Sequence, residues 1–262
     1  MKILFLGDIV GRPGRQIVKH FIPILRKHHI LDLVIANAEN AAGGTGIDYS
    51  TADELLTAGV DIITLGNHVW KRRETPELLK QNSQRIIRPL NFPTGVPGVG
   101  LAKFITDSGV TINVVNLIGR IFMDEVTDCP FQIIDHLLKN KLKDEKIVFI
   151  DFHAEATSEK NALAWFLDGR VTALCGTHTH VQTADERIFP QGLAFISDAG
   201  MCGAKNGILG VDYQPIVKKF LTGMPVKFEV PKGSAILNGV IVSCDESSGR
   251  AMTIERIYEQ LL

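Results

Sequence analysis

The sequence predicts an α/β fold, organised as an α+β sandwich in which two sheets form the core and helices flank them. Through the first two thirds of the chain, short apolar runs bounded by turn residues alternate with stretches of helical periodicity, which is typical of βαβ units around a buried sheet. The final third contains strand-like runs with one clear helix, which indicates a second, antiparallel sheet. The 262 residues contain no low-complexity tract and no composition break deep enough for a linker, so we expect one domain over residues 1–262.

Each element is expected from its own local pattern. Apolar runs that end at turn residues predict strands over residues 3–6, 33–36, 62–65, 110–117, 146–152 and 171–176. Apolar residues spaced at i, i+3 and i+4 predict helices over 15–29, 51–58, 75–81, 131–143 and 161–167, although Pro23 interrupts the first pattern. The final third predicts strands over 193–196, 226–230, 235–244 and 252–258, and a helix over 213–221.

Charge and cysteine usage exclude several classes of protein. The 28 Lys and Arg residues nearly balance 29 Asp and Glu residues, and this net charge of -1 argues against bulk electrostatic binding of nucleic acid. The four cysteines are far apart and form no Cys-x-x-Cys pair, which fits neither a disulfide framework nor a zinc knuckle and favours a cytoplasmic protein. No apolar run approaches the ~20 residues of a membrane span, so no membrane partner is expected.

Side chains that can bind metal ions follow five of the predicted strands. They are Asp8, Glu39 with Asn40, Asn67 with His68, His153, and finally His178 with His180. Open α/β folds bind ligands at the carboxyl ends of their parallel strands, so we expect these residues to converge at the edge of one sheet. In an extended segment residues i and i+2 face the same side, which favours metal binding by the last two histidines.

The donor types indicate a binuclear metal site. Carboxylate, amide and imidazole groups suit iron, manganese or zinc better than calcium, and their number exceeds the needs of one tetrahedral ion. Two ions that share a bridging carboxylate would use them all, and Glu39 is the only carboxylate after the second strand. Taken singly, some of these residues have a structural interpretation: Asp8 and Asn67 could cap or turn the chain, and Glu39 could lie in a solvated loop.

At these motifs the sequence resembles the calcineurin-like metallophosphoesterases, whose strand ends carry Gly-Asp, Gly-Asn-His, a lone His and Gly-His-x-His. The runs at 7–15, 36–44 and 151–160 look like those of the bacterial YmdB-type phosphodiesterases, and the resemblance spans nearly the whole chain. Two positions depart from the wider superfamily. Val10 stands where a second ligand, commonly His, follows the first aspartate, and Glu39 with Asn40 replaces the usual bridging Asp.

The resemblance implies a metallophosphoesterase-like fold, a reaction and a role for each site residue. One metal ion would be held by Asp8, Glu39, Asn40 and His180, and the other by Glu39, Asn67, His153 and His178. Iron ranks first, with manganese and zinc as alternatives. The implied reaction opens 2′,3′-cyclic nucleotides to nucleoside monophosphates by attack of a metal-bound hydroxide, with His68 as proton donor.

Three other interpretations stay open at this point. The same centre could serve a phosphomonoesterase or a nuclease, or a regulatory protein that senses a nucleotide and turns it over slowly. A metal-dependent hydrolase barrel also uses His-x-His, but normally on its first strand, whereas this pair lies at 178 and 180. A homo-oligomer is left open as well.

Overall fold

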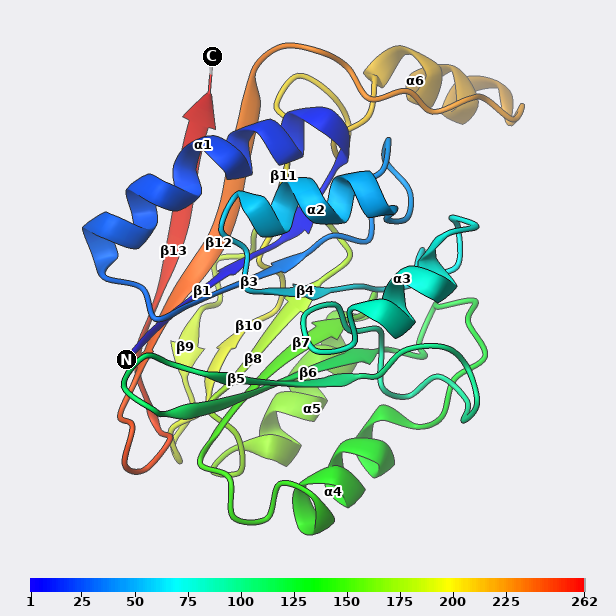
Figure 1. Ribbon diagram of the computed structural model, residues 1–262. Helices are drawn as coiled ribbons and strands as arrows, with labels where there is room; N and C mark the ends of the chain where they lie inside the picture. The colour runs from blue at the N-terminus through cyan, green and yellow to red at the C-terminus, as the bar shows by residue number, and fades with distance from the viewer. Residues whose placement is uncertain (262) are drawn as a thin grey trace.

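The structure is a computed structural model and describes residues 1–261. Two mixed sheets form its centre (Figure 1). The first sheet has seven strands in the order β2-β11-β12-β1-β3-β4, with β13 paired to β12. These strands are β1 (Lys2–Leu6), β2 (Asp8–Ile9), β3 (Leu33–Asn37), β4 (Ile62–Thr64), β11 (Met201–Ala204), β12 (Ala235–Cys244) and β13 (Ala251–Leu261).

The second sheet has six strands in the order β5-β6-β7-β8-β10-β9. They are β5 (Leu101–Ile105), β6 (Thr111–Ile118), β7 (Ile147–His153), β8 (Ala173–Thr177), β9 (Arg187–Ile188) and β10 (Ala194–Ile196). In this sheet β6, β7, β8 and β10 run parallel, and in the first sheet β1, β3 and β4 run parallel. Each sheet therefore gathers the carboxyl ends of several strands along one edge.

Strand alternation builds the layers of the sandwich. In β1, Ile3 and Phe5 belong to the cluster between the two sheets, whereas Leu4 and Leu6 belong to the cluster under the helices. Successive side chains of a strand point to opposite faces, so a continuous apolar run buries both faces at once. Between the sheets Phe5 meets Phe149 of β7 with ring centroids 5.2 Å apart. Both sheets thus share one apolar interior.

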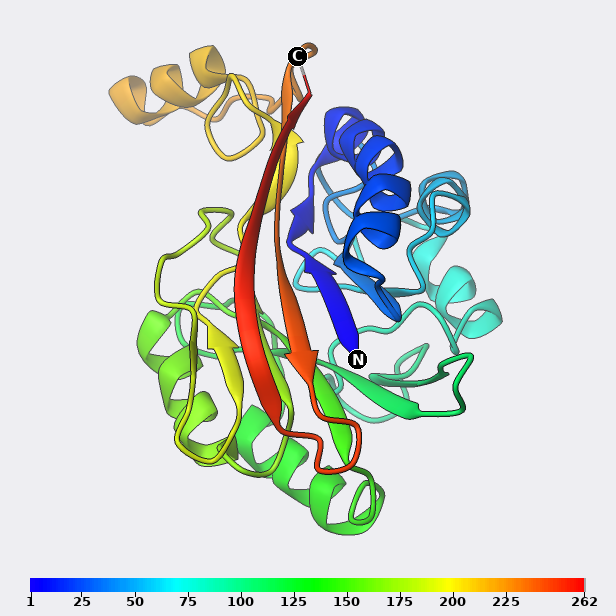
Figure 2. The same ribbon diagram turned by 90° about the vertical axis from the view of Figure 1, so that its left-hand side faces the viewer.

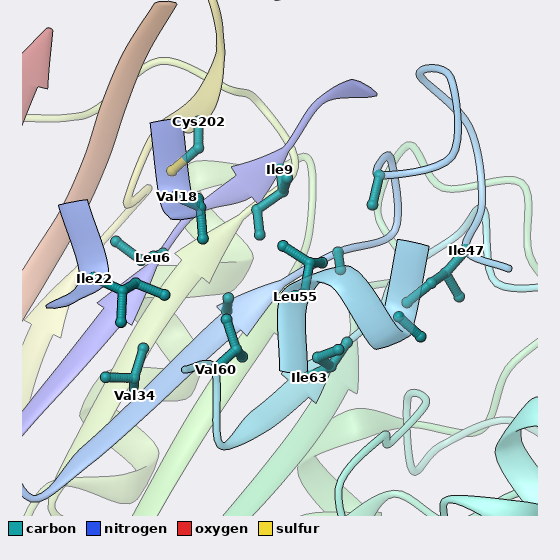
Figure 3. Close-up of a cluster of buried hydrophobic side chains, with 14 of the residues drawn as sticks. Leu6, Ile9, Val18, Ile22, Val34, Ile47, Leu55, Val60, Ile63 and Cys202 are labelled. Carbon is teal, nitrogen blue, oxygen red and sulfur yellow. The ribbon is translucent and has the colours of Figure 1, made fainter. Parts of the chain in front are cut away.

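Helices cover the outer faces of both sheets. On the first sheet lie α1 (Gly11–His29), α2 (Tyr49–Thr57) and α3 (Thr75–Gln81), and on the second lie α4 (Pro130–Asn140) and α5 (Thr157–Leu167). Figure 3 shows Val18 and Ile22 of α1 and Leu55 of α2 packed against Leu6 and Ile63. By contrast α6 (Tyr213–Thr222) projects from the rest of the molecule (Figures 1 and 2), and Ile216 is its only buried residue.

The structure confirms the α/β fold class with two sheets and flanking helices, but it corrects the composition of the second sheet. The strands of the final third do not form an antiparallel sheet of their own. Instead β12 and β13 join the first sheet, with β12 antiparallel to β1, and β10 joins the second sheet parallel to β8. Figure 2 shows β12 and β13 crossing the whole molecule between the two sets of helices. Strand pairing is decided by burial of both faces, which a local pattern does not show.

Other expectations differ in detail. Residues 226–230 form no strand, because these half-buried or exposed residues find no partner strand and lie between Pro225 and Pro231. The sequence analysis missed the antiparallel edge strand β5 and the short strands β2, β9 and β11. Pro23 does not interrupt α1, which continues to His29. Ile30 then ends the helix in the left-handed conformation.

Two simpler expectations concern cysteines and membranes. All four thiols, Cys129, Cys175, Cys202 and Cys244, are free. Within residues 1–261 every helix is too short or too polar to cross a bilayer.

Candidate metal centre

The predicted site residues meet in one place, but they come from two sheets and not from one. The first sheet supplies Asp8, Glu39, Asn40, Asn67 and His68, which follow β1, β3 and β4. The second sheet supplies His153, His178 and His180, which end β7 or follow β8. The two sheets pack face to face with these strand ends on the same side, so a ligand set divided between them closes around a common point.

One group of atoms surrounds the Nε2 atom of His153. Asn67 Oδ1 lies 2.9 Å from it, His178 Nδ1 lies 3.0 Å from it, and Glu39 Oε2 lies 3.2 Å from it. Glu39, His153 and His178 each offer a ligand atom, and these atoms all lie within 4.8 Å of one another. A carboxylate with two imidazoles and an amide oxygen is a donor set suited to iron, manganese or zinc.

A buried chain of hydrogen bonds fixes which nitrogen of His153 carries the proton. Thr177 Oγ1 donates to Asp151 Oδ1 at 2.7 Å, so its lone pair is left to accept from His153 Nδ1 at 2.9 Å. In the neutral ring, Nε2 then has a lone pair with which to bind a metal ion, as a metal-binding histidine requires. The second oxygen of Asp151 accepts from Thr64 Oγ1 at 2.5 Å and Asn37 Nδ2 at 2.9 Å, both from the first sheet.

A second group of atoms surrounds the carboxylate of Asp8. Its Oδ2 accepts the His178 amide at 3.0 Å, while its fully buried Oδ1 has no hydrogen-bond partner within the described chain. His180 Nε2 lies 3.9 Å from this oxygen and 3.2 Å from Asn40 Nδ2. The other nitrogen of His180, Nδ1, lies 3.0 Å from the Leu209 carbonyl, to which it donates, so Nε2 is unprotonated in the neutral ring.

Glu39 stands between the two groups and divides its oxygens between them. Oε2 faces His153, and Oε1 lies 3.1 Å from Asn40 Nδ2 and 3.3 Å from His68 Nδ1. Burial opposes its charge, but the neighbouring imidazoles of His153 and His68 outweigh burial and hold the pKa of Glu39 well below its usual range. It is therefore a charged, buried carboxylate with one oxygen facing each group, as the predicted bridging role requires.

The histidines of the first group have opposite pKa shifts. Burial lowers the pKa of His153, but the facing carboxylates of Glu39 and Asp8 outweigh burial and raise it to about 9. Burial and the charge on His153 together lower the pKa of His178 to about 3. The Nε2 atom of His178 lies 3.2 Å from Glu155 Oε2, and its Nδ1 atom faces His153.

Asn40 presents the nitrogen of its amide to Glu39 and His180, and its Oδ1 lies 2.6 Å from His68 Nδ1. An amide nitrogen does not bind a metal ion, so the predicted ligand role of Asn40 requires the amide to turn over. The hydrogen bond with His68 can persist after that rotation, but the Asn40 amide then donates to His68 Nδ1 and no longer accepts from it.

The local backbone explains how the ligands come so close. A side chain on Gly66, just before Asn67, would overlap Glu39 Oε2 and the ring of His153, so only glycine fits there. The segment after β8 corrects the sequence argument about alternation. His178 and His180 have φ angles of 102° and 66°, so the segment is a turn and not an extended strand, and its two imidazoles face different groups.

Several residues at the centre escaped the sequence analysis, namely Asp151, Glu155, Lys160, Thr177 and Asp198. Asp151 and His153 are residues i and i+2 of β7, so their side chains lie on the same face of the strand. This alternation could have identified Asp151 from the sequence. The ion pair of Lys160 with Asp198 left no such signal, because its partners are 38 residues apart.

The model of the YmdB-like protein family matches residues 4–257. The chain belongs to the YmdB-like family.

Two YmdB-like relatives illustrate the match in sequence. The chain is 46% identical over 257 residues to a 2′,3′-cyclic-nucleotide 2′-phosphodiesterase of Bacillus subtilis, covering 98% of this chain and 96% of the relative. It is 39% identical over 265 residues to a putative phosphatase/phosphodiesterase of Mycoplasma genitalium, covering 98% and 92%.

Solved structures agree with the YmdB-like assignment. A hypothetical protein from Thermus thermophilus superposes with a TM-score of 0.92 at 40% identity and covers 99% of both chains. A protein described as a novel phosphatase of Mycoplasma pneumoniae superposes with a TM-score of 0.92 at 36% identity, covering 99% of this chain and 93% of that one.

Proposed function

We propose that the protein is a phosphodiesterase that uses two metal ions to open 2′,3′-cyclic nucleotides to nucleoside monophosphates. The protein belongs to a family whose members include an enzyme that hydrolyses phosphate esters. The finer assignment, to a cyclic nucleotide, draws on the name of the Bacillus relative, which is similar over almost the whole chain.

The observation that carries the proposal is an excess of acceptors over protons. Around His153 Nε2, the atoms Asn67 Oδ1, Glu39 Oε2 and His178 Nδ1 can all accept, yet this nitrogen can supply at most one proton to the three of them. Close by, Asp8 Oδ1 is buried with no partner in residues 1–261. Buried acceptors are normally satisfied, and a cation at each point would satisfy these.

This geometry supports the two ligand sets that the family resemblance implies. One ion would take Asn67, His153 and His178 with Glu39 Oε2, and the other would take Asp8, Asn40 and His180 with Glu39 Oε1. When bound, two such ions lower the pKa of a coordinated water towards about 7 and neutralise phosphoryl oxygens. Iron ranks first as the metal, with manganese and zinc as alternatives, and anomalous scattering at the three absorption edges distinguishes them.

The protein's own part in the reaction centres on His68. In the described orientation its Nδ1 lies 2.6 Å from Asn40 Oδ1 and 3.3 Å from Glu39 Oε1, which holds the ring in place. Once Asn40 turns over to bind a metal ion, its amide would donate to Nδ1, and the proton of the neutral ring would lie on Nε2. The ring is 28% exposed, which leaves it accessible to a substrate at the centre. His68 would protonate the sugar oxygen that leaves phosphorus, an effect worth roughly 10² to 10⁴ in rate.

A substrate panel tests the proposal directly. Metal-loaded protein should hydrolyse 2′,3′-cyclic AMP with a kcat/KM well above that for 3′,5′-cyclic AMP, and chelation should abolish both activities. Bis-p-nitrophenyl phosphate should serve as a generic diester. Preference for 3′,5′-cyclic AMP, or activity that survives complete metal removal, would overturn the proposal.

The second candidate is a phosphomonoesterase, because two relatives are described as phosphatases. A kcat/KM for p-nitrophenyl phosphate above that for every diester would favour it. A nuclease and a slow nucleotide sensor remain alternatives. Assays with RNA substrates test the first, and single-turnover rates test the second. Cytoplasmic location, one domain over residues 1–262 and a homo-oligomer also remain predictions from the sequence.

A further inference from the structure

The turn that carries His178 and His180 has a conformation that needs external support. Both residues have positive φ angles, 102° and 66°, which side chains with a Cβ atom rarely adopt. Such a backbone persists only where its surroundings determine it. Because the two imidazoles serve different proposed ions, a small movement of this turn would displace one ligand of each.

Thr179, between the two histidines, is held by a buried carboxylate. Asp198 Oδ2 accepts the Thr179 amide at 3.0 Å and the Thr179 hydroxyl at 2.8 Å, and Asp198 Oδ1 accepts the Gly200 amide at 2.8 Å. Asp198 follows β10 and is 1% exposed. A single side chain therefore accepts from both hydrogen-bond donors of the central residue of the turn, its amide and its hydroxyl.

Lys160 of α5 completes this arrangement from the other side. Its side chain is 2% exposed, and its Nζ donates to Asp198 Oδ2 at 3.1 Å and to the Thr177 carbonyl at 2.9 Å. Thr177 is the last residue of β8, so one ammonium group joins the end of the strand to the carboxylate that holds the turn. A buried ion pair is a poor way to gain stability alone, since apolar residues of similar size often do better.

We propose that Lys160 and Asp198 are positioning residues that hold the 178–180 turn so that its two histidines reach two different metal ions. This inference rests on the proposed function, because that proposal supplies the metal ions. The support of the turn rests on the contacts of Thr179 alone. The clamp, meaning Lys160, Asp198 and Thr179, touches neither the proposed ions nor the substrate.

The first experiment examines the turn in the metal-free protein. Lys160→Met keeps most of the volume of the side chain and removes its charge, so the Thr179 amide should exchange with solvent deuterium at least tenfold faster. The matched control is Arg170→Met, which breaks the Arg170–Asp135 ion pair, whose Nη2–Oδ1 distance is 2.7 Å, outside the turn. An unchanged exchange rate at Thr179 in Lys160→Met, or an equal change in the control, overturns the clamp.

The second experiment measures metal binding by equilibrium dialysis against Mn²⁺. Lys160→Met should weaken binding of both ions at least tenfold, and saturating Mn²⁺ should restore most of kcat with little change in KM. Thr179→Val removes only the hydroxyl contact and should show a smaller loss, which Thr179→Ser reverses. These variants keep the inference testable if Lys160→Met fails to fold.

The outcomes separate the two proposals. If wild-type protein binds no Mn²⁺, the proposed function fails, while hydrogen exchange at Thr179 still decides whether the clamp exists. If wild type binds two ions and both Lys160→Met and Thr179→Val bind them with unchanged affinity, the positioning role is wrong and the metal centre stands.

Discussion

At the scale of single residues, the centre is defined by buried groups that would be unfavourable in an ordinary core. Asp8 Oδ1 is fully buried without a partner among residues 1–261, and burial raises the pKa of this carboxyl. An unsatisfied buried acceptor costs about 1–3 kcal/mol. In the proposed function, the lone pair of this oxygen would instead bind a cation.

Glu39 is the residue whose replacement should be most damaging. Glu39→Gln keeps the shape of the side chain but removes the charge that two ions would share, so we expect loss of at least 99% of the phosphodiesterase activity and of one bound metal ion. Metal analysis and kcat measure the two effects. Glu77→Gln, on the exposed surface of α3, is the control. Wild-type turnover with two tightly bound ions in Glu39→Gln would show that the bridging assignment is wrong.

His68 should matter unequally for different leaving groups. A sugar hydroxyl leaves poorly unless it is protonated, whereas p-nitrophenolate leaves readily without help. His68→Ala should therefore slow the opening of 2′,3′-cyclic AMP by roughly 10² or more and the cleavage of bis-p-nitrophenyl phosphate far less, with metal content unchanged. Equal losses on both substrates, or loss of metal, would instead make His68 a positioning residue or a ligand.

The sequence was sufficient to predict that eight residues lie close together, since each of the eight follows or ends a strand and the structure gathers them all. Their individual roles remain predictions. The pattern could not show that the ligands are divided between two sheets, because strand order depends on contacts between distant segments. It also could not show the positive φ angles at His178 and His180, whose segment is in contact with the distant residue Asp198.

At the scale of elements, long periodic segments were predicted well and strand partners poorly. The residues of β12 have the composition of a strand, but only the complete fold shows that this strand pairs with β1 on one side and β13 on the other. Residues 226–230 have a similar β-branched and aromatic composition and remain unpaired. Propensity in strands reflects a half-buried surface that a neighbour must supply, so composition alone does not distinguish these two segments.

The turn between β12 and β13 should lose stability in acid. Asp245 Oδ1 accepts from Ser247 Oγ at 2.6 Å, from Ser248 Oγ at 2.7 Å and from the Ser248 amide at 2.8 Å. These hydrogen bonds lower the pKa of Asp245 from 3.8 to about 2, so its contribution is complete above about pH 3.8 and is lost as the pH falls through about 2. Denaturant midpoints of wild type and Asp245→Asn should therefore differ at pH 6 and converge below pH 3.

A gap between those midpoints that stays constant down to pH 2 would contradict this account of the turn. Ser247→Ala, which removes one of the three donors, should give an intermediate result and serves as the internal control.

At the scale of the whole molecule, metal ions should stabilise the sandwich because their proposed ligands come from both sheets. At a free concentration 100 times the dissociation constant, one bound ion adds about 2.7 kcal/mol to the free energy of unfolding. Loss of one ion should therefore lower Tm by roughly 5–10 °C for a chain of this size, and chelation of both ions by roughly 10–20 °C. Scanning calorimetry with and without chelator measures the change.

The double variant His178→Ala with His180→Ala provides the control, since its Tm should not respond to the chelator. A wild-type Tm that is also insensitive would mean that no ion bridges the two sheets.

The division of the ligands between two sheets gives the apolar interior a kinetic role. Phe5 and Phe149 meet between the sheets, so the volume of such side chains sets the spacing and lateral offset of the two layers. The same packing therefore sets the distance between the carboxylates of the first sheet and the imidazoles of the second sheet. A displacement of about 1 Å can cost roughly 100-fold in rate even when its origin is remote. Selection for catalytic speed therefore acts on hydrophobic residues that never meet the substrate, and laboratory evolution of this enzyme should accumulate changes there.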